Sequence, residues 1–373
     1  MEERVNSFNV KIEDDDCVAV SDAVINGWGN LRDKYVLEME SKLQLITDNK
    51  YAIAVSHGTD AIHLALAALD LKPGDEVIVP DLTWVACVAP VVHMGLMPVF
   101  INSDDSLCVS PNSFLKAITK NTKVIIAVDI AGSLPDWDKI IQIARLNNIY
   151  IIEDAAESLG GFYKNRPAGS FGDISILSFS GTKVVTGGHG GAVLTNNEFL
   201  YKKMKLLYHH GIDQNLSGKY YWSTVTGYNF QISNIQAALI VSQLNRLESL
   251  VAYKKNLFTL YDEHLANFKN VSLVKPKFDN RNSFWLIVAL INNKLNIKKE
   301  DLILAANKKN VDIRPFFYLL SEMPPFENYK TELSENREET QEFSKFGICL
   351  PYGYDMSATK VKKVVTVLEE ILE

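Results

Sequence analysis

Short apolar runs rich in β-branched residues alternate with helix-like stretches from residue 51 to residue 197. The apolar runs are continuous, which is typical of parallel strands that are covered on both faces. The expected strands are 51–56, 76–80, 98–102, 123–131, 149–154, 174–180 and 191–195, and the expected helices are 59–70, 84–94, 111–120 and 136–148. This repetition predicts a doubly wound α/β fold whose central sheet is mostly parallel and flanked by helices.

The pattern changes after a long helical stretch at 233–265, which we expect to bridge two domains. Later segments predict a smaller α+β unit, with strands near 272–276, 284–291 and 311–317 and helices at 300–310 and 358–373. We therefore expect a large cofactor-binding domain at 1–245, whose N-terminal segment is a candidate to pack on the other domain, and a small C-terminal domain at 246–373. The polar segment 328–343 fits either a loop or a solvated helix.

The composition narrows the class of protein. The formal net charge is −7 and no basic face compensates for it, which argues against nucleic-acid binding. The four cysteines show neither metal-ligand nor disulfide spacing, so free thiols are expected and no metal site. No apolar run is long enough to span a membrane, and the acidic N-terminus is unlike a secretory signal, so we expect a cytoplasmic location.

Acidic residues and a lysine follow the expected strands. Asp154 ends one strand and Glu157 lies on the next turn, whereas Lys183 follows another strand in a glycine-rich segment. Asp81 and His57 also fall at strand ends, which form the ligand edge of such a sheet. A carboxylate that keeps a pyridine nitrogen protonated and a lysine that forms a Schiff base are what pyridoxal 5'-phosphate requires. This cofactor is therefore predicted.

Other residues near strand ends suit the same cofactor but have plainer alternatives. The N–H groups of Gly58 and Thr59 would form a phosphate site at a helix N-terminus, although Thr59 could simply cap the helix. Trp84 could stack on the pyridine ring or pack in the core. Taken alone, Asp154 could cap a helix and Glu157 could be a solvated turn residue.

Together, the order and spacing of these features resemble the DegT/DnrJ/EryC1/StrS family of sugar aminotransferases, within the fold-type I pyridoxal-phosphate enzymes. The chain is most similar to the perosamine and viosamine synthase branch, and the resemblance covers nearly its whole length. The matching segments are GWGNLRDKYVLEME (27–40), 55–84, IIEDAAESLGG (151–161), 169–196, 221–239, NSFW (282–285) and IRPFFYLLSEMPPF (313–326).

The resemblance implies a role for each matching position around the cofactor. Lys183 resembles the lysine that binds the cofactor and moves protons, and Asp154 matches the acid on the pyridine nitrogen. Glu157 matches the residue at the cofactor's 3-hydroxyl, and Trp84 the aromatic on its ring. The positions that match phosphate-binding residues are Gly58, Thr59 and Ser178.

The resemblance also implies a homodimer whose active sites are built from both chains. Asn229 matches an asparagine that reaches the phosphate of the neighbouring subunit's cofactor. Four residues match stretches near the sugar-nucleotide pocket: Trp28, His189, Arg314 and Phe316.

Three segments depart from the family pattern, at four positions. His57 replaces the asparagine of S-N-G-T, His189 replaces the glutamate of G-E-G-G, and Asp129 and Ala131 replace the histidine and tyrosine of H-x-Y-G. Two interpretations of His57 and His189 stay open, namely neutral drift and a changed pocket polarity that selects another sugar or amino donor.

The expected function is pyridoxal-phosphate-dependent transfer of an amino group from L-glutamate to a nucleotide-linked keto-sugar, best guessed as a 4-keto-6-deoxyhexose on GDP or dTDP. The alternatives are dehydration or deoxygenation of a sugar, amination of a cyclitol, and a non-catalytic paralogue that binds sugar nucleotides. Lys183 separates the chain from dehydratase relatives, in which a histidine takes that position.

Overall fold

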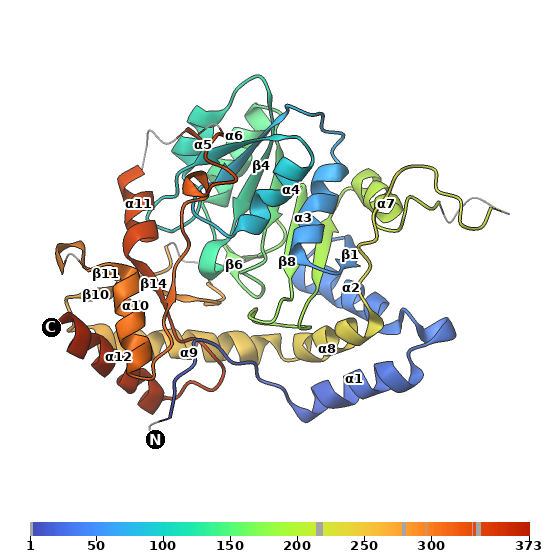
Figure 1. The fold of residues 1–373 in the computed structure, drawn as a ribbon. Coiled ribbons are helices and arrows are strands. Elements are labelled where there is room, and N and C mark those ends of the chain that lie inside the picture. Colours follow the sequence, from blue (N-terminus) through green and yellow to red (C-terminus); the bar gives the residue numbers. More distant parts are fainter. Residues whose placement is uncertain (1–2, 214–218, 278–280, 296, 330, 333–336) are drawn as a thin grey trace.

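A central eight-stranded sheet forms the larger part of the computed structural model, which describes residues 3–213, 219–277, 281–295, 297–329, 331–332 and 337–373. The strand order is β1-β9-β8-β5-β4-β2-β3-β13 (Figure 1). Its strands are β1 Tyr51–Val55, β2 Glu76–Pro80, β3 Met97–Ile101, β4 Thr122–Val128, β5 Tyr150–Asp154, β8 Ile174–Ser178, β9 Gly191–Thr195 and β13 Thr331–Glu332. The predicted α/β class and the position of each expected strand are confirmed.

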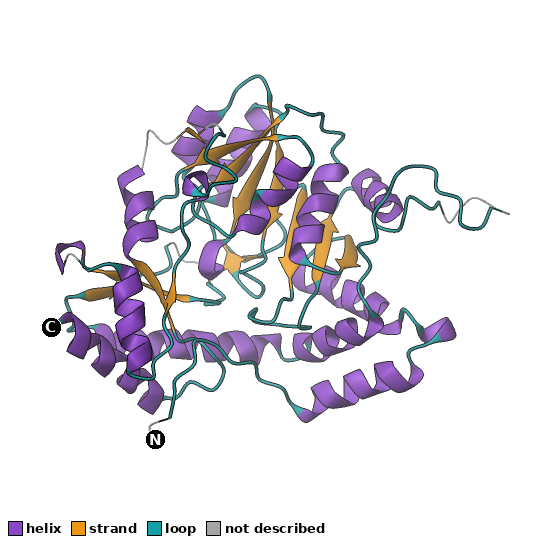
Figure 2. Cartoon of the chain, viewed as in Figure 1, coloured by secondary structure: helices purple, strands orange, loops and turns teal. Residues whose placement is uncertain are grey.

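Helices cover both faces of this sheet (Figure 2). Successive residues of β2 belong to different cores, because Ile78 packs with the residues of α5 and α6 whereas Val77 and Val79 pack with those of α3 and α8. This explains why the strands read as continuous apolar runs. The helices of this part are α1 Asp14–Asn26, α2 Lys34–Thr47, α3 Gly58–Ala67, α4 Ala89–His93, α5 Pro111–Ala117, α6 Trp137–Leu146, α7 Glu198–Leu207 and α8 Asn234–Leu244.

The sheet is mostly parallel, as expected, but it contains one antiparallel strand next to the edge strand β1 and gains an unexpected strand at the other edge. Strand β9 runs antiparallel to both β1 and β8, so the Gly-rich segment before it returns the chain as a hairpin rather than as a helical crossover. At the other edge, β13 pairs in parallel with β3, with Thr331 opposite Phe100. The polar segment 328–343 therefore contributes a short strand, and the following helix α11 spans Arg337–Phe346.

The long helical stretch expected at 233–265 consists of two helices. Helix α8 ends at Leu244 and α9 spans Leu247–Leu265, with Asn245 and Arg246 between them. Arg246 leaves the helical backbone and its guanidinium pairs with the buried carboxylate of Asp16 in α1. Both helices run beneath the two sheets in Figure 1.

A second sheet of four strands lies beside the first, in the order β10-β11-β14-β12. Its elements are β10 Val271–Leu273, β11 Ile287–Ile291, α10 Lys299–Lys308, β12 Arg314–Pro315, β14 Gly347–Leu350 and α12 Ala358–Leu372. The N-terminal segment packs here, because Val5 bridges Val311 and the carbonyl of Ser7 accepts from the Tyr352 N–H at 2.7 Å. Residue 245 as the domain boundary stays a prediction.

No helix among the described residues has both the length and the apolar character needed to cross a membrane.

A buried carboxylate holds the turn before β8. Glu153 lies within β5 and is fully buried; it accepts from the N–H groups of Gly169 at 2.6 Å and Phe171 at 2.7 Å, and from the Ser175 hydroxyl at 2.7 Å. Burial raises the pKa of Glu153, and these donors oppose the rise. The side chain therefore supplies acceptors that the turn cannot obtain from water.

Replacement of this carboxylate tests its structural role. We expect Glu153→Ala to lower the free energy of unfolding by about 3 kcal/mol or more, because several buried donors lose their acceptor at once. Urea denaturation measures the change. Glu198→Ala, at an exposed glutamate paired with Lys202, is the control and should leave the midpoint nearly unchanged. Equal effects of the two substitutions would contradict the assignment.

Candidate active site

A cavity of about 470 Å³ opens at the carboxyl ends of β2, β5 and β8. Loops after these strands form one wall, and the small sheet contributes the opposite wall through Trp285, Arg314 and Tyr352. Of the residues predicted for the site, the cavity brings together Gly58, Thr59, Trp84, Asp154, Glu157, Ser178, Lys183 and Arg314.

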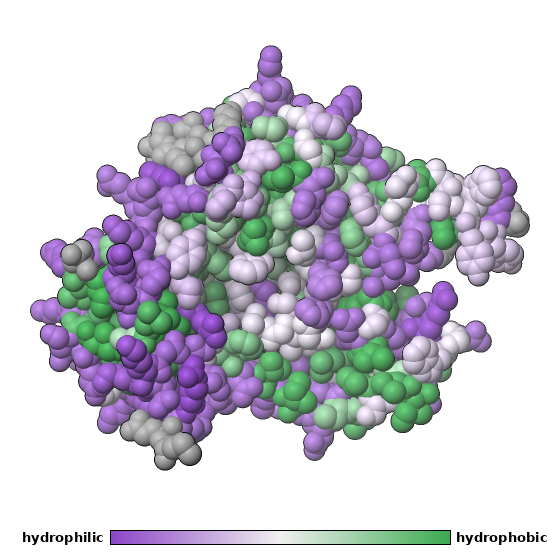
Figure 3. All heavy atoms as spheres, in the orientation of Figure 1, coloured by the Kyte–Doolittle hydropathy of each residue, from purple (hydrophilic) through white to green (hydrophobic). Residues whose placement is uncertain are grey.

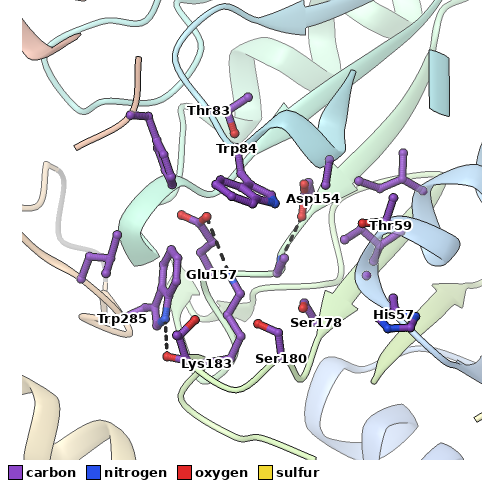
Figure 4. Close-up of a pocket in the computed structure, with 18 of the residues that line it drawn as sticks. His57, Thr59, Thr83, Trp84, Asp154, Glu157, Ser178, Ser180, Lys183 and Trp285 are labelled. Carbon is purple, nitrogen blue, oxygen red and sulfur yellow. Dashed lines mark hydrogen bonds and ion pairs between the residues drawn. The ribbon is translucent and has the colours of Figure 1, made fainter. Parts of the chain in front are cut away.

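Three ionisable side chains meet inside the cavity (Figure 4). Lys183 lies in the loop between β8 and β9, and its Nζ is 3.6 Å from Oε1 of Glu157. Asp154 ends β5 and is 4% exposed. Oε2 of Glu157 accepts from the Ala131 N–H at 2.7 Å, which fixes this carboxylate from the opposite side. The arrangement pairs a nucleophilic amine with two carboxylates that water hardly reaches.

Burial controls the protonation of these groups. It raises the pKa of Glu157 to about 7, while the charge of Lys183 and the Ala131 N–H oppose the rise. Burial also raises the pKa of Asp154 and lowers that of Lys183, and the neighbouring carboxylates limit the latter shift. A lysine with a lowered pKa supplies more neutral amine, which is the nucleophilic form.

Trp285 shields the lysine from solvent. The Nζ of Lys183 lies 3.5 Å from the centroid of the Trp285 ring. The indole N–H donates to the carbonyl of Thr182 at 2.7 Å, so the ring is tied to the lysine's own loop. A tryptophan face attracts the cationic form of lysine and excludes water from it.

The helix start at the end of β1 suits an anion. Helix α3 begins at Gly58, and a Cβ placed there would lie 2.9 Å from the Cβ of Ser178, closer than real contacts allow. Gly58 thus lets the first N–H groups of the helix lie beside the end of β8, where Ser178 lines the same cavity as Thr59. Free N–H groups and the positive end of the helix dipole favour a phosphate here.

Aromatic and cationic side chains form the mouth of the cavity. The ring of Trp84 is 6.3 Å from that of Phe317, and 58% of the Trp84 residue surface is exposed. Arg314 donates to Asp312 at 3.0 Å, which orients an otherwise exposed guanidinium beside the opening. A planar ring and a charged phosphate could therefore both be bound near the entrance.

The departures at His57 and His189 form one cluster. The two rings are 4.9 Å apart, and Nδ1 of His57 lies 3.0 Å from Oδ2 of Asp60 in the first turn of α3. His57 lines the cavity, whereas His189 does not and packs against the His57 ring. Both substitutions therefore change the polarity around one place, the end of the cavity beside the start of α3.

The departures at Asp129 and Ala131 support the site from behind. Asp129 is fully buried, and its Oδ2 accepts from the Ser158 hydroxyl at 2.6 Å. Ala131 has a φ of 54° and donates its N–H to Glu157. Neither side chain lines the cavity, so these two substitutions act on the turn that carries Glu157 rather than on a ligand directly.

Four predicted positions lie outside the lining of the cavity. Phe316 is 1% exposed and packs against Gly347, and the next residue, Phe317, faces the cavity instead. Trp28 is 65% exposed beyond the end of α1, and Asn229 is exposed near His209. His189 is the fourth, as described above.

Asp81 follows β2 directly, as expected, but its side chain does not line the cavity. It is fully buried and accepts from Ser321 N at 2.7 Å and from Arg337 Nη1 at 3.0 Å. These partners are far from Asp81 in the sequence, so Asp81 fastens Ser321 and Arg337 to the end of β2.

Sequence reasoning missed several residues that line the cavity or support it. Trp285 lay within a segment quoted for the resemblance, but nothing in its local pattern indicated that it reaches Lys183. Cys87 is a free thiol, as expected, but its spacing in the sequence did not indicate that its Sγ lies 3.1 Å from Oδ2 of Asp154. Thr83, Phe317 and Tyr352 also line the cavity or its mouth.

The raised pKa of Glu157 predicts a pH effect on stability. In the window from about 4.5, the ordinary value, to about 7, the folded chain binds more protons at this site than the unfolded chain. Glu157 therefore contributes stability at the lower end of this window and loses it as pH rises. We expect the wild type to lose up to about 3 kcal/mol relative to Glu157→Gln between pH 4.5 and pH 7.5.

Urea denaturation of the cofactor-free protein at several pH values measures this difference. Glu370→Gln, at an exposed glutamate paired with Lys309, should run parallel to the wild type. A parallel curve for Glu157→Gln would mean that Glu157 titrates as an ordinary glutamate.

Comparison with known proteins agrees with this geometry. Residues 10–369 match the model of the DegT/DnrJ/EryC1/StrS aminotransferase family. The GDP-perosamine synthase of Caulobacter vibrioides is 32% identical over 348 residues, which cover 92% of each chain. The GDP-perosamine synthase of Vibrio cholerae is also 32% identical, covering 92% of this chain and 93% of that one.

Solved structures share the fold. The putative sugar aminotransferase Spr1654 from Streptococcus pneumoniae, in its PMP-form, superimposes with a TM-score of 0.89 at 25% identity and covers 99% of this chain and 98% of that one. A GDP-4-keto-6-deoxymannose-3-dehydratase with bound GDP-perosamine has a TM-score of 0.89 at 22% identity, covering 98% of this chain and 100% of that one. The match to the family model spans nearly the whole sequence, and the chain belongs to the DegT/DnrJ/EryC1/StrS aminotransferase family.

Proposed function

We propose that the protein is a pyridoxal-phosphate-dependent aminotransferase that moves the amino group of L-glutamate to a nucleotide-linked keto-sugar, a 4-keto-6-deoxyhexose carried on GDP or dTDP. The observation that carries the proposal is the meeting of Lys183, Asp154 and Glu157 in one enclosed cavity. The names of the relatives that are 32% identical favour GDP as the nucleotide.

The donor set of the cavity fits pyridoxal phosphate. A helix N-terminus with the Thr59 and Ser178 hydroxyls suits the phosphate, and the buried carboxylate of Asp154 suits a protonated ring nitrogen. Trp84 offers an aromatic face and Glu157 a group for the 3-hydroxyl. When bound, the cofactor supplies an aldehyde that reacts with an amine and a ring that takes up electrons from the substrate carbon.

The residues of the chain then have separate tasks. The carboxylate of Asp154 would stabilise the protonated ring nitrogen. For this, Asp154 must stay ionised although water hardly reaches it. Lys183, in its neutral form, would hold the cofactor through its aldehyde, and its Nζ would carry a proton to and from the substrate carbon. Glu157, with a pKa of about 7, can hold a proton beside Nζ of Lys183. Trp285 keeps water away from Lys183 during this exchange.

Amino transfer is favoured over dehydration because Lys183 lies within the cavity, where its amine can act both as the nucleophile and as the proton carrier. The dehydratase structures are 20–22% identical, and their likeness concerns the fold. A non-catalytic role is disfavoured, because burial of Asp154 and Lys183 is costly and a protein without the reaction has no need for it. The four cysteines of the chain are free, which supports the proposed cytoplasmic location.

Two exposed surfaces support a homodimer with shared sites. Figure 3 shows a hydrophobic band over α1, where Val18, Val24 and Ile25 are 48% to 73% exposed. Tyr220 and Tyr221, on the segment between α7 and α8, are more than 90% exposed. Apolar groups gathered in this way favour an interface. Asn229 follows on the same segment and could thus reach the partner's cavity.

The first test is amino transfer itself. With pyridoxal phosphate, the purified protein should show an absorption band that changes on addition of L-glutamate, and the mass of a GDP-linked 4-keto-6-deoxyhexose should shift to that of its amine. Lys183→Ala should abolish both, because no amine remains to bind the cofactor or move the proton. Lys202→Ala, at an exposed lysine, is the control. Release of 2-oxoglutarate without an aminated sugar would overturn the proposal.

The second test is complementation between subunits. Lys183→Ala and Asn229→Ala should each be inactive or nearly so alone. If each site uses Lys183 of one chain and Asn229 of the other, a mixed dimer holds one intact site. Equal mixing after reversible dissociation should restore about a quarter of wild-type activity. A mixture with no recovered activity, although mass analysis finds mixed dimers, would place both residues in the site of one chain.

A further inference from the structure

The buried face of Asp154 is held by a thiol. Cys87 ends a short 3₁₀ helix at Val85–Cys87, after β2, and its Sγ lies 3.1 Å from Oδ2 of Asp154. The other oxygen, Oδ1, accepts from the Ala156 N–H at 3.1 Å. The Ala156 N–H belongs to the backbone and is fixed by the turn. The Cys87 thiol belongs to a side chain, so a substitution can remove it.

A third group stands behind the thiol. The Oγ1 of Thr83 is 3.5 Å from Sγ of Cys87, and either atom could donate by distance alone. Thr83 and Cys87 are each 1% exposed, so water does not compete for these contacts. The three side chains come from the loop after β2 and the end of β5.

The chemistry of the three groups decides the direction of the hydrogen bonds. An ionised carboxylate only accepts, so the single S–H hydrogen must point at Asp154. Burial raises the pKa of Cys87 well above its ordinary value, so the thiol keeps this hydrogen at neutral pH. The sulfur can then only accept from Thr83, whose hydroxyl has a hydrogen to give. The relay runs from Thr83 to Cys87 to Asp154.

We propose that Cys87 is a positioning residue for Asp154: oriented by the Thr83 hydroxyl, its thiol holds one carboxylate oxygen and so fixes the group that faces the cofactor. The role of Asp154 toward the ring nitrogen rests on the proposed function; the relay itself does not.

A thiol suits this task because it is a weak donor. It keeps the carboxylate from rotating yet withdraws little of its charge, so Asp154 stays able to pair with a ring cation. Cys87→Ser keeps a donor at nearly the same place, and Cys87→Ala removes it. The serine variant should therefore retain the function of the position and the alanine variant should lose it.

The contact can be tested without cofactor. The S–H stretching band of Cys87 in the infrared spectrum is identified as the band that is lost in Cys87→Ser. In the cofactor-free protein this band should move to higher frequency in Asp154→Asn, because a neutral amide is the weaker acceptor, and should also move in Thr83→Val. Cys108→Ser, at a buried thiol that donates to the Ser133 carbonyl at 3.2 Å, removes a different band and is the control. A Cys87 band that ignores both substitutions would overturn the relay.

The consequence can be tested with the cofactor. Cys87→Ala should weaken the binding of pyridoxal phosphate about two- to tenfold and shift the pH at which its absorption band changes, whereas Cys87→Ser should stay within about twofold of the wild type. Thr83→Val should weaken binding in the wild type but have no further effect in Cys87→Ala, since it acts through the sulfur. Cys108→Ser should change neither the affinity nor the pH of the band.

Three results would overturn the positioning role. Cys87→Ala could bind pyridoxal phosphate as tightly as the wild type, or Cys87→Ser could bind it as weakly as Cys87→Ala. The third result is that the Thr83 and Cys87 substitutions have additive effects on this affinity. Failure of the wild type to bind pyridoxal phosphate would instead refute the proposed function, while the infrared experiment would still decide whether the relay exists.

Discussion

The active-site geometry depends on keeping three ionisable side chains away from water at one edge of a parallel sheet. Asp154, Glu157 and Lys183 would each lose solvation energy in this cavity, and their mutual contacts, nearby N–H donors, the Cys87 thiol and the Trp285 ring compensate for part of it. The same desolvation makes the groups useful, because it raises the pKa of Glu157 toward neutrality and lowers that of Lys183. The cost in stability and the chemical reactivity thus have one physical source.

The water-free environment is made by parts of the chain that are distant in sequence. Trp285 comes from the second sheet and covers Lys183. Tyr352 is held by the N-terminal segment, since its N–H donates to the Ser7 carbonyl and its ring lies 6.4 Å from that of Phe8. Residues near both sheets therefore meet at the site, and the cover over Lys183 depends on the contact between the two parts of the chain.

Residues outside the lining of the cavity determine the orientation of the Asp154 and Glu157 carboxylates. Ala131 fixes Glu157 through its N–H, and Cys87 holds Asp154 through its thiol. Asp129 accepts from Ser158 and so supports the turn that carries Glu157. The departures from the family pattern fall into two groups: Asp129 and Ala131 lie in this supporting layer, and His57 with His189 lies at the end of the cavity beside α3. Of the four residues, only His57 lines the cavity itself.

The sequence by itself determined the elements and the chemistry that is local in the chain. Continuous apolar runs specified the buried strands, because a strand covered on both faces is mostly apolar, and the acids and the lysine after them indicated a ligand edge. Tertiary structure alone decided the antiparallel course of β9, the break at Arg246, the use of Asp81 as an anchor, and the arrival of Trp285, Tyr352 and Cys87 around the charges. The physical reason is that these features depend on partners from distant segments, and no local pattern of residues records which partner a side chain will meet.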